Sequence, residues 1–303
     1  MGFVIATDEK GAVFLKIVVC IKQVVDVAFP FDLDSETCEI ALDDLFYIVN
    51  PADLCAAEAA LKMKEATNGQ IIYISLGPSR VERALRKSMA FGGDEAIHIL
   101  CEEAMPDSRI VAHALSRIIK PLIPDIVVCG SRSLDNNESE IPAFLAEWLD
   151  FPQLTGITAW ELYPVCKQMR VERKLERGRR VALDCRLPAV VSIEPEAESP
   201  RYVTLPDIMH AARSDVKRID FKELESEESI HKLKSAKSFV HYSLPRPRPK
   251  KQFVFNSELS ADERMDMMMS GPIKKETRLL EGNPVELAEK IMQIIKSKVP
   301  NLK

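Results

Sequence analysis

The sequence predicts an α/β protein built around a parallel sheet. Between residues 14 and 149, short apolar runs rich in β-branched residues alternate with segments of helical periodicity. Such alternation is typical of consecutive βαβ units, whose right-handed crossovers place helices on both faces of the sheet. The chain has 303 residues, of which 46% are hydrophobic and 29% are charged. This balance is that of an ordinary globular protein with a sizeable core.

Local signals predict the individual elements. Asn50 and Pro51 suit the N-cap and the first position of a helix, and Gly69 suits its end. A double glycine, Gly92-Gly93, closes the next helix. The predicted strands are 14–24, 70–77, 96–101 and 125–130, and the predicted helices are 52–66, 78–93, 108–120 and about 138–149.

Residues 165–193 break this alternation. Their centre is charged and contains Gly178, a pattern that predicts an antiparallel hairpin returning into a buried strand. Beyond residue 213 the composition becomes charge-rich, which predicts an exposed helix over 214–238. The proline-rich stretch 244–251 should be extended and solvated.

Two short amphipathic helices should follow that stretch, with Ser260 and Asn283 as their N-caps. We therefore divide the chain into a core at 1–213 and a C-terminal arm at 214–303.

Composition and charge exclude several classes of function. The formal net charge of −5 is mild, and no basic stripe interleaved with aromatic residues occurs, so we expect no nucleic-acid partner. No apolar run approaches the roughly 18 residues of a membrane helix, so we expect no direct insertion into a membrane. The first residues lack the apolar region of a secretory signal. We expect a cytoplasmic protein of a bacterium or archaeon, with the mitochondrial matrix as the less favoured alternative.

The cysteines and histidines predict neither a catalytic group nor a metal site. The five histidines are dispersed, and no HExxH or GxSxG motif occurs. His98 should be a core residue and His113 a packing residue of a helix. The seven cysteines form no CxxC pair, which indicates free thiols in a reducing compartment, several of them packed as small hydrophobes. They are Cys20, Cys38, Cys55, Cys101, Cys129, Cys166 and Cys185.

Polar loops follow three of the predicted strands, at 20–26, 75–79 and 129–139. The carboxyl ends of parallel strands meet at one edge of a sheet, where ligands bind in open α/β folds. Gly130 lets the backbone approach a ligand closely, and a helix beginning near Glu138 would direct free N–H groups at the loop. Neither the dinucleotide glycine fingerprint nor the phosphate-loop lysine motif is present. The sequence favours a nucleotide binder without its own nucleophile, with ordinary polar loops as the alternative.

Five segments, in this order, carry a resemblance to a known family. They are "VVCIKQVVD", "VNPADLCAAEAALKMKE", "ISLGPSRVERALRKSMAFGGDEAIHI", "VVCGSRSLDNNESEIPAFLAEWLDFPQ" and "RLPAVVSIEPEAESPRYVTLPDIMHA". Together they resemble the β subunit of electron transfer flavoprotein over about residues 14–213. Such co-linearity is more specific than any single short motif.

The resemblance implies a heterodimer and an adenine-nucleotide-binding α/β fold of the stress-protein (HUP-like) type. The α subunit would carry the redox FAD, and the β subunit would enclose AMP, or a second FAD in flavin-bifurcating members that oxidise NADH. Electrons would come from acyl-CoA dehydrogenase-type flavoenzymes of fatty acid β-oxidation and pass to a quinone oxidoreductase, usually at a membrane. The chain would then be an electron carrier subunit rather than an enzyme.

The resemblance also implies nucleotide-binding positions on the strand-end loops, with Asp135 and nearby amides close to the sugar or phosphate. The matching residues are Cys20, Ile21, Lys22, Asp26, Asn50, Ser75, Gly77, Cys129, Gly130, Ser131, Ser133, Leu134, Asp135, Asn136, Asn137 and Ser139.

The chain departs from the family where a Thr-Gly or Val-Gly pair usually cradles a phosphate. It has Glu140, Ile141 and Pro142 there; proline lacks an N–H donor and glutamate adds negative charge. We therefore expect AMP or a similarly sized ligand, with FAD or an empty site as alternatives. A bifurcating subunit and an AMP-binding sensor of the stress-protein kind are the alternative functions.

The stretch "ESPRYVTLPDIMHAAR", residues 198–213, predicts an exposed turn leading into a short helix. In the family this is a recognition loop, here near 198–210, whose leucine inserts into an apolar pocket on the dehydrogenase. The matching partner-binding residues are Tyr202, Leu205, Pro206, Ile208 and Met209. The arm at 214–303 would wrap the α subunit, with Met265, Met268, Met269, Leu287, Ile291, Ile294 and Ile295 on its apolar faces, or else would dock on its own domain.

Overall fold

The computed structural model describes residues 14–29, 45–102, 107–224, 260–262, 265 and 282–298. It divides into two compact units, residues 1–244 and 245–303, which we describe separately. The predicted features at 244–251, Met268 and Met269 lie outside the described residues.

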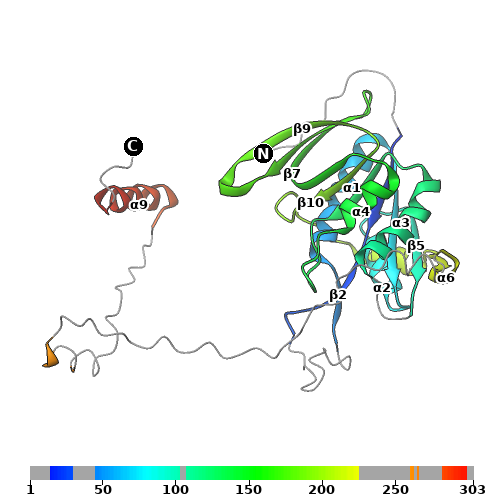
Figure 1. Cartoon of the computed structure of the whole chain (residues 1–303), viewed down its shortest axis with the longest axis horizontal. Coiled ribbons are helices and arrows are strands. Elements are labelled where there is room, and N and C mark those ends of the chain that lie inside the picture. The colour runs from blue at the N-terminus through cyan, green and yellow to red at the C-terminus, as the bar shows by residue number, and fades with distance from the viewer. Residues whose placement is uncertain are drawn as a thin grey trace. The chain divides into compact units, whose positions relative to one another are not determined.

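The first unit is built on a nine-stranded sheet in the order β11-β5-β4-β1-β6-β10-β7-β8-β9 (Figure 1). All neighbours from β11 to β7 pair in parallel, whereas β8 pairs antiparallel with both β7 and β9. The predicted α/β class with a largely parallel sheet is confirmed. The strands are β1 (Lys16–Cys20), β4 (Gln70–Gly77), β5 (Glu95–Leu100), β6 (Ile126–Gly130), β7 (Gln153–Tyr163), β8 (Gln168–Lys174), β9 (Arg180–Arg186), β10 (Ala189–Ile193) and β11 (Lys217–Asp220).

Helices cover both faces of this sheet, as the βαβ alternation predicts. One core layer includes side chains of α1, α2 and α5, and the other includes side chains of α3, α4 and α6. The helices are α1 (Pro51–Thr67), α2 (Val81–Met89), α3 (Ser108–Leu122), α4 (Ile141–Leu149), α5 (Leu205–Arg213) and α6 (Phe221–Leu224). A separate antiparallel ribbon joins β2 (Gln23–Val25) to β3 (Tyr47–Val49).

The central strands are continuous apolar runs because both of their faces are buried. In β1, Val18 belongs to one core layer and Val19 to the other, and both are fully buried. Helix α1 packs on the sheet through small side chains, among them Ala56 and Ala60. Such small residues let the helix lie close to the strand ends that carry the polar loops. His98 is fully buried, as predicted, with its Nε2 atom 2.9 Å from the carbonyl oxygen of Gly77.

The charged segment 165–193 forms the predicted antiparallel hairpin, β8–β9, and returns into the buried strand β10. Its turn contains Gly178 with φ of 75°, a conformation that favours glycine. The strand β7 was not predicted, because its sequence mixes polar and apolar residues without a clear period. In Figure 1 the green strands β7 and β9 extend beyond the helical layers.

The sheet continues past the predicted core boundary at residue 213. β11 pairs with β5 in parallel, and Val216 and Phe221 are buried. The predicted helix over 214–238 therefore begins instead as a strand followed by the single-turn helix α6. The charged residues that suggested an exposed helix lie at the edge of the sheet, where β11 keeps three of its four side chains exposed.

In the second unit, Asn283 precedes helix α9 (Pro284–Lys298), and its Oδ1 atom accepts a hydrogen bond from the backbone N–H of Val285 at 3.2 Å. This confirms Asn283 as the predicted N-cap. Ser260 directly precedes two helical residues. Val285, Ile291 and Met292 are exposed apolar side chains of α9. Among the residues described in both units, none belongs to a helix long and apolar enough to span a membrane.

Gly130, at the end of β6, must remain a glycine for this packing to persist. A Cβ atom there would lie 2.2 Å from Oδ1 of Asp53 and 2.8 Å from the backbone carbon of Ala52. We expect Gly130→Ala to lower the free energy of unfolding by about 1–3 kcal/mol, because the start of α1 must move away from the sheet. Urea unfolding at constant m-value measures this loss. An unchanged midpoint would contradict the close approach of α1 to β6.

Candidate functional site

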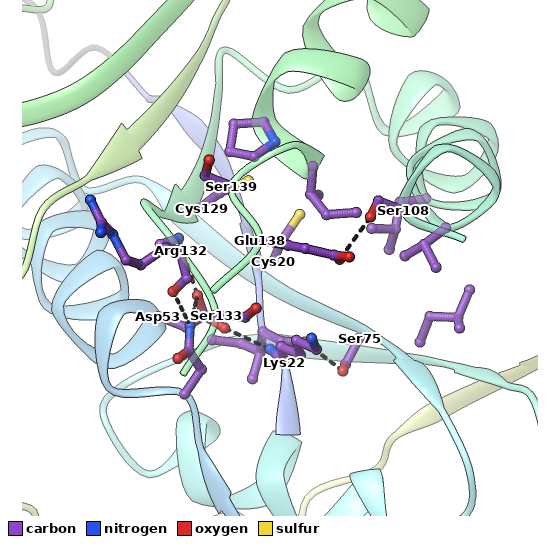
Figure 2. Close-up of a pocket in the computed structure, with 18 of the residues that line it drawn as sticks. Cys20, Lys22, Asp53, Ser75, Ser108, Cys129, Arg132, Ser133, Glu138 and Ser139 are labelled. Carbon is purple, nitrogen blue, oxygen red and sulfur yellow. Dashed lines mark hydrogen bonds between the residues drawn. The ribbon is translucent and has the colours of Figure 1, made fainter. Parts of the chain in front are cut away.

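A cavity of about 410 Å³ lies at the carboxyl ends of β1, β4 and β6, beside the first residues of α1, α3 and α4 (Figure 2). This is the edge at which open α/β sheets bind ligands. Its walls combine an apolar slot with a polar rim. The slot includes Ile74, Leu76, Val111, Leu115 and Ile141, the floor includes the buried Asn50 and Asp53, and the rim includes Lys22, Ser108, Arg132, Ser133, Asp135, Asn136, Glu138 and Ser139.

The structure gathers most of the predicted nucleotide-binding residues around this cavity. Those that line it are Cys20, Ile21, Lys22, Asn50, Ser75, Cys129, Gly130, Ser133, Asp135, Asn136 and Ser139. The lining thus draws on all three of the polar loops, although they are far apart in the sequence.

The other predicted positions do not line the cavity. The Ser131 hydroxyl donates to Glu194, and Leu134 donates its backbone N–H to Asn50 Oδ1 at 3.1 Å. Asn137 is exposed, with φ of 56° in the loop. The predicted positions outside the lining are Asp26, Gly77, Ser131, Leu134 and Asn137.

Several lining residues were not predicted. Asp53 lies in the first turn of α1, where an acidic residue is an ordinary feature of a helix start. Ser108 and Val111 belong to α3, whose approach to the cavity depends on tertiary packing. Leu76, Arg132 and Glu138 lie inside the predicted loops 75–79 and 129–139, and Ile141 and Pro142 lie where the resemblance places the phosphate cradle, but none was named as a binding residue. The lining residues that no prediction covered are Asp53, Ile74, Asp107, Ser108, Val111 and Leu115. The relation of these six to the site could not be read from spacing along the chain.

The carboxylate of Asp53 joins three elements at the floor of the site. Its Oδ2 atom accepts the backbone N–H of Lys22 at 2.7 Å, and its Oδ1 atom accepts the backbone N–H of Gly130 at 3.2 Å and Nδ2 of Asn50 at 3.0 Å. Burial raises the pKa of Asp53 to about 7, although these hydrogen bonds and the positive charge of Lys22 act in the opposite direction. Asp53 therefore holds the ends of β1 and β6 against the start of α1.

Asn50 occupies the predicted N-cap position but uses its side chain differently. It makes no cap hydrogen bond to its own helix. Instead, Nδ2 donates to the carbonyl oxygen of Arg132 at 2.9 Å, and Oδ1 accepts the N–H of Leu134. The amide is buried and fixes the loop after β6 relative to α1.

Lys22 and Asp135 form an ion pair across the cavity rim. The Lys22 Nζ atom lies 2.8 Å from the Asp135 carboxylate and also donates to Asn136 Oδ1 at 3.3 Å. Burial would raise the pKa of Asp135, but the hydrogen bond and charge of Lys22 hold it below its ordinary value. The pair ties the loop after β1 to the loop after β6.

Two thiols, those of Cys20 and Cys129, face each other on the cavity wall. Both residues are buried, and their strands, β1 and β6, are adjacent and parallel. A hydrogen bond that the Cys129 thiol donates to the sulfur of Cys20, followed by burial, holds the pKa of Cys129 well above its ordinary value. Cys129 is therefore a protonated, weakly nucleophilic thiol, and both cysteines act as small wall residues.

Helix α4 begins later than predicted. Its first residue is Ile141, not Glu138, and Pro142 occupies its first turn. The side chain of Glu138 instead extends along the cavity, where its carboxylate accepts the hydroxyl of Ser108 at 2.8 Å (Figure 2). The backbone N–H groups of residues 138–140 therefore do not belong to a helix N-terminus, contrary to the prediction.

A second surface lies on α5 and the segment before it. Thr204 caps this helix, its hydroxyl accepting the N–H of Asp207. The exposed fractions are 92% for Tyr202, 67% for Leu205, 49% for Ile208 and 50% for Met209. These four residues, which we name the α5 patch, are among the predicted partner-binding residues, and Pro206 beside them is also exposed.

Ion pairs between buried carboxylates and partly exposed cations fix the segment that leads to the α5 patch. Arg201 makes hydrogen bonds with both oxygens of Glu58 and also contacts Glu65, both on α1. Glu198 accepts from Lys62 of the same helix at 2.5 Å and from Nε1 of Trp160 at 3.1 Å. The side chains of Glu58 and Glu198 are only 3% and 2% exposed. Since breaking a buried pair leaves an uncompensated charge, these contacts hold the segment firmly on α1.

The fold and the cavity define the class: an open α/β protein that takes its ligand at the carboxyl ends of parallel strands. A family model described as the electron transfer flavoprotein domain matches residues 38–224. The chain belongs to the electron transfer flavoprotein family, and its curated relatives include β subunits of that family.

Three relatives illustrate the match. The electron transfer flavoprotein subunit beta of Thermoanaerobacterium thermosaccharolyticum is 32% identical over 229 residues, covering 75% of this chain and 86% of the relative. The human subunit beta is 29% identical over 210 residues, covering 68% and 81%. Protein FixA of Azotobacter vinelandii is 29% identical over 249 residues, covering 79% and 88%.

The raised pKa of Asp53 predicts a pH dependence of stability. The ordinary pKa is 3.8 and the folded value is about 7, so between these values the folded chain holds one more proton than the unfolded chain. The contribution of Asp53 to stability is therefore complete below about pH 4 and is lost as the pH rises towards 7. The free energy of unfolding of the wild type minus that of Asp53→Asn should fall by about 1.4 kcal/mol per pH unit in this window.

Urea unfolding of the ligand-free chain at several pH values between about 4 and 8 measures this difference. Above about pH 8 it should be constant. A difference that does not vary with pH would contradict a neutral Asp53 in the folded chain.

Proposed function

We propose that the chain is the β subunit of a heterodimeric electron transfer flavoprotein. It would accept electrons from acyl-CoA dehydrogenase-type flavoenzymes and pass them to a quinone oxidoreductase, as an electron carrier of the cytoplasm rather than an enzyme. The observation that carries this proposal is the α5 patch, four apolar side chains exposed on a segment that ion pairs with buried carboxylates fix in place. A sensor that acts alone has no need of such a surface, which favours the carrier over the stress-protein alternative.

The redox FAD belongs in this proposal to the α subunit, and the cavity of this chain holds AMP or an adenine ligand of similar size. A volume of about 410 Å³ lies near the lower end of the range for small-molecule sites, which favours AMP over a second FAD. The apolar slot between Leu76 and Val111 suits an adenine ring. The ribose hydroxyls would meet polar groups of the rim such as Ser139 and Asn136.

The second unit would contact the α subunit. Val285, Ile291 and Met292 of α9 are 68%, 46% and 45% exposed, and one helix cannot bury these apolar side chains by itself. A partner surface is the simplest cover for it. This assignment keeps the proposed partner-contacting arm of residues 214–303 but removes β11 and α6 from it. β11 pairs with β5 of the sheet, and α6 packs in one of its core layers.

The composition of the bound nucleotides tests the proposal. The chain is produced together with the flavin-binding α subunit encoded in the same genome, and the purified complex is denatured. The released compounds are then identified by mass and stoichiometry. We expect one FAD and one AMP-sized adenine compound per heterodimer. Two FAD per heterodimer, with flavin reduction driven by NADH, would establish the bifurcating alternative, and failure to copurify with a flavin-bearing partner would refute the carrier function.

Leu205 should be the anchor of the α5 patch. Replacing it by alanine removes an exposed apolar side chain without touching the cavity, so Leu205→Ala should raise the KM of the donor dehydrogenase for this carrier about tenfold or more. The nucleotide content should stay unchanged. Steady-state reduction of the complex by the donor measures the effect.

Val165→Ala provides the control, because Val165 is 57% exposed but lies in the turn between β7 and β8. It should leave the KM unchanged. Equal effects of both substitutions, or none from Leu205→Ala, would refute a docking role for the α5 patch.

A further inference from the structure

Helix α5 carries most of the α5 patch but is barely packed against the rest of the first unit. Of its nine residues, Leu205–Arg213, only Ala211 is buried. Burial of an apolar face is what usually fixes a helix in a fold, and an isolated helix of this length is marginal in water. The position of α5 therefore depends on the polar contacts at its two ends.

The residues before α5 hold its first turn. The ion pairs that Arg201 and Glu198 make with α1 fix the preceding segment, and the Thr204 hydroxyl caps the helix. These contacts fix one end only. The direction of the helix axis needs a second fixed point at the other end.

Arg86 of α2 supplies that second point. Its Nη1 atom makes hydrogen bonds with the carbonyl oxygens of Ser214 at 2.7 Å, Ala212 at 2.8 Å and Ala211 at 3.3 Å. The last carbonyl groups of a helix have no partner within the helix and carry partial negative charge, so a guanidinium there is favourable on both counts. Hydrogen bonds from a charged donor are also stronger than those between neutral groups.

Glu82 keeps the guanidinium of Arg86 in this orientation. It lies one turn earlier on α2, and its Oε1 atom accepts Nε of Arg86 at 3.1 Å and Nη2 at 2.8 Å, which leaves Nη1 for α5. The other oxygen of Glu82 accepts Nε of Arg218 on β11 at 3.0 Å. The hydrogen bonds from Arg86 and Arg218 lower the pKa of Glu82. Glu82 therefore stays charged at neutral pH and keeps Arg218 as a partner when Arg86 is replaced.

We propose that Arg86 is a positioning residue for partner docking. By holding the last turn of α5 against α2, it keeps Leu205, Ile208 and Met209 in the arrangement that the donor dehydrogenase recognises. The inference rests on the proposed function and deepens it, since it adds to the docking surface a residue outside the α5 patch. Without Arg86 the helix samples other orientations, and the apparent affinity of the patch falls with the fraction of molecules in the competent one.

Arg86→Met tests the inference, because it removes the donors and keeps an unbranched side chain. The purified complex with the α subunit is reduced by an acyl-CoA dehydrogenase-type donor and its acyl-CoA substrate. The variant should raise the KM of the donor for this carrier about fivefold, with kcat and nucleotide content as in the wild type. Arg86→Lys, which keeps a cation able to donate to the same carbonyl groups, should recover part of the loss.

Hydrogen exchange distinguishes local positioning from a general loss of stability. In the Arg86→Met complex the backbone amides of residues 208–214 should exchange about fivefold or more faster, whereas those of α1 and the central strands should not change. Unchanged exchange of residues 208–214 would overturn the inference.

Arg117→Met is the matched control. Arg117 of α3 also donates to a carbonyl oxygen at the end of a helix, that of Leu224 in α6, at 2.6 Å. Its helix belongs to the other core layer, on the face of the sheet opposite to α5. Arg117→Met should therefore leave the KM and the exchange of α5 unchanged. Equal effects of Arg86→Met and Arg117→Met on the KM would overturn the inference.

A double variant shows whether Arg86 acts through the α5 patch. In a Leu205→Ala background the anchor is missing, so adding Arg86→Met should raise the KM about twofold or less. The same factor in both backgrounds would overturn the inference, as would an effect of Leu205→Ala with none from Arg86→Met. If Leu205→Ala itself leaves the KM unchanged, the docking role of the α5 patch in the proposed function is refuted, and the inference with it.

Discussion

The buried carboxylate of Asp53 is the contact on which the site depends. It accepts hydrogen bonds from Lys22, Asn50 and Gly130, which come from the loop after β1, the start of α1 and the end of β6. Parallel strands separated by long crossovers have no local turn to align their ends. A single acceptor shared by their backbone N–H groups supplies that alignment. Because Gly130 has no side chain, the start of α1 can lie close to the end of β6, and the Asp53 carboxylate can reach both strands.

Helix α1 joins the two functional surfaces of the protein. Asp53 in its first turn shapes the cavity, and Glu58, Lys62 and Glu65 farther along hold the segment before α5. The helix also packs on the sheet through alanines, so it has little freedom to move independently of the strands. The α5 patch is thus fixed to the same rigid element as the cavity, although about 150 residues separate Asp53 from Leu205 in the sequence.

The elements were predictable where a local signal decided them. The apolar runs of β1 and β6, the helix after Asn50 and the hairpin around Gly178 all follow from period, caps and turn chemistry. β7 and β11 could not be predicted, because partly polar strands become strands only through pairing with β10 and β5. The family resemblance depends on co-linear segments and agrees with the match to the family model.

The candidate site was predictable only in part, for the same reason. Strand-end loops are visible in the sequence, so residues such as Lys22 and Asp135 could be named in advance. Asp53 and Glu138 could not, because the function of a carboxylate depends on which N–H or hydroxyl groups the fold brings to it. Glu138 would be a helical residue if α4 began where the sequence suggested. The later start leaves its side chain free to reach Ser108.

The side chains of the α5 patch contribute no burial free energy to folding, because they are exposed to water. A loose segment before Tyr202 and Leu205 would let these side chains occupy many positions. The pairs of Arg201 with Glu58 and of Lys62 with Glu198 limit this freedom, because releasing either would leave a buried carboxylate without its cation. A patch held in this way loses less conformational entropy when a partner covers it. The ion pairs therefore contribute to association by fixing the free state, even though they stand outside the surface that the partner would touch.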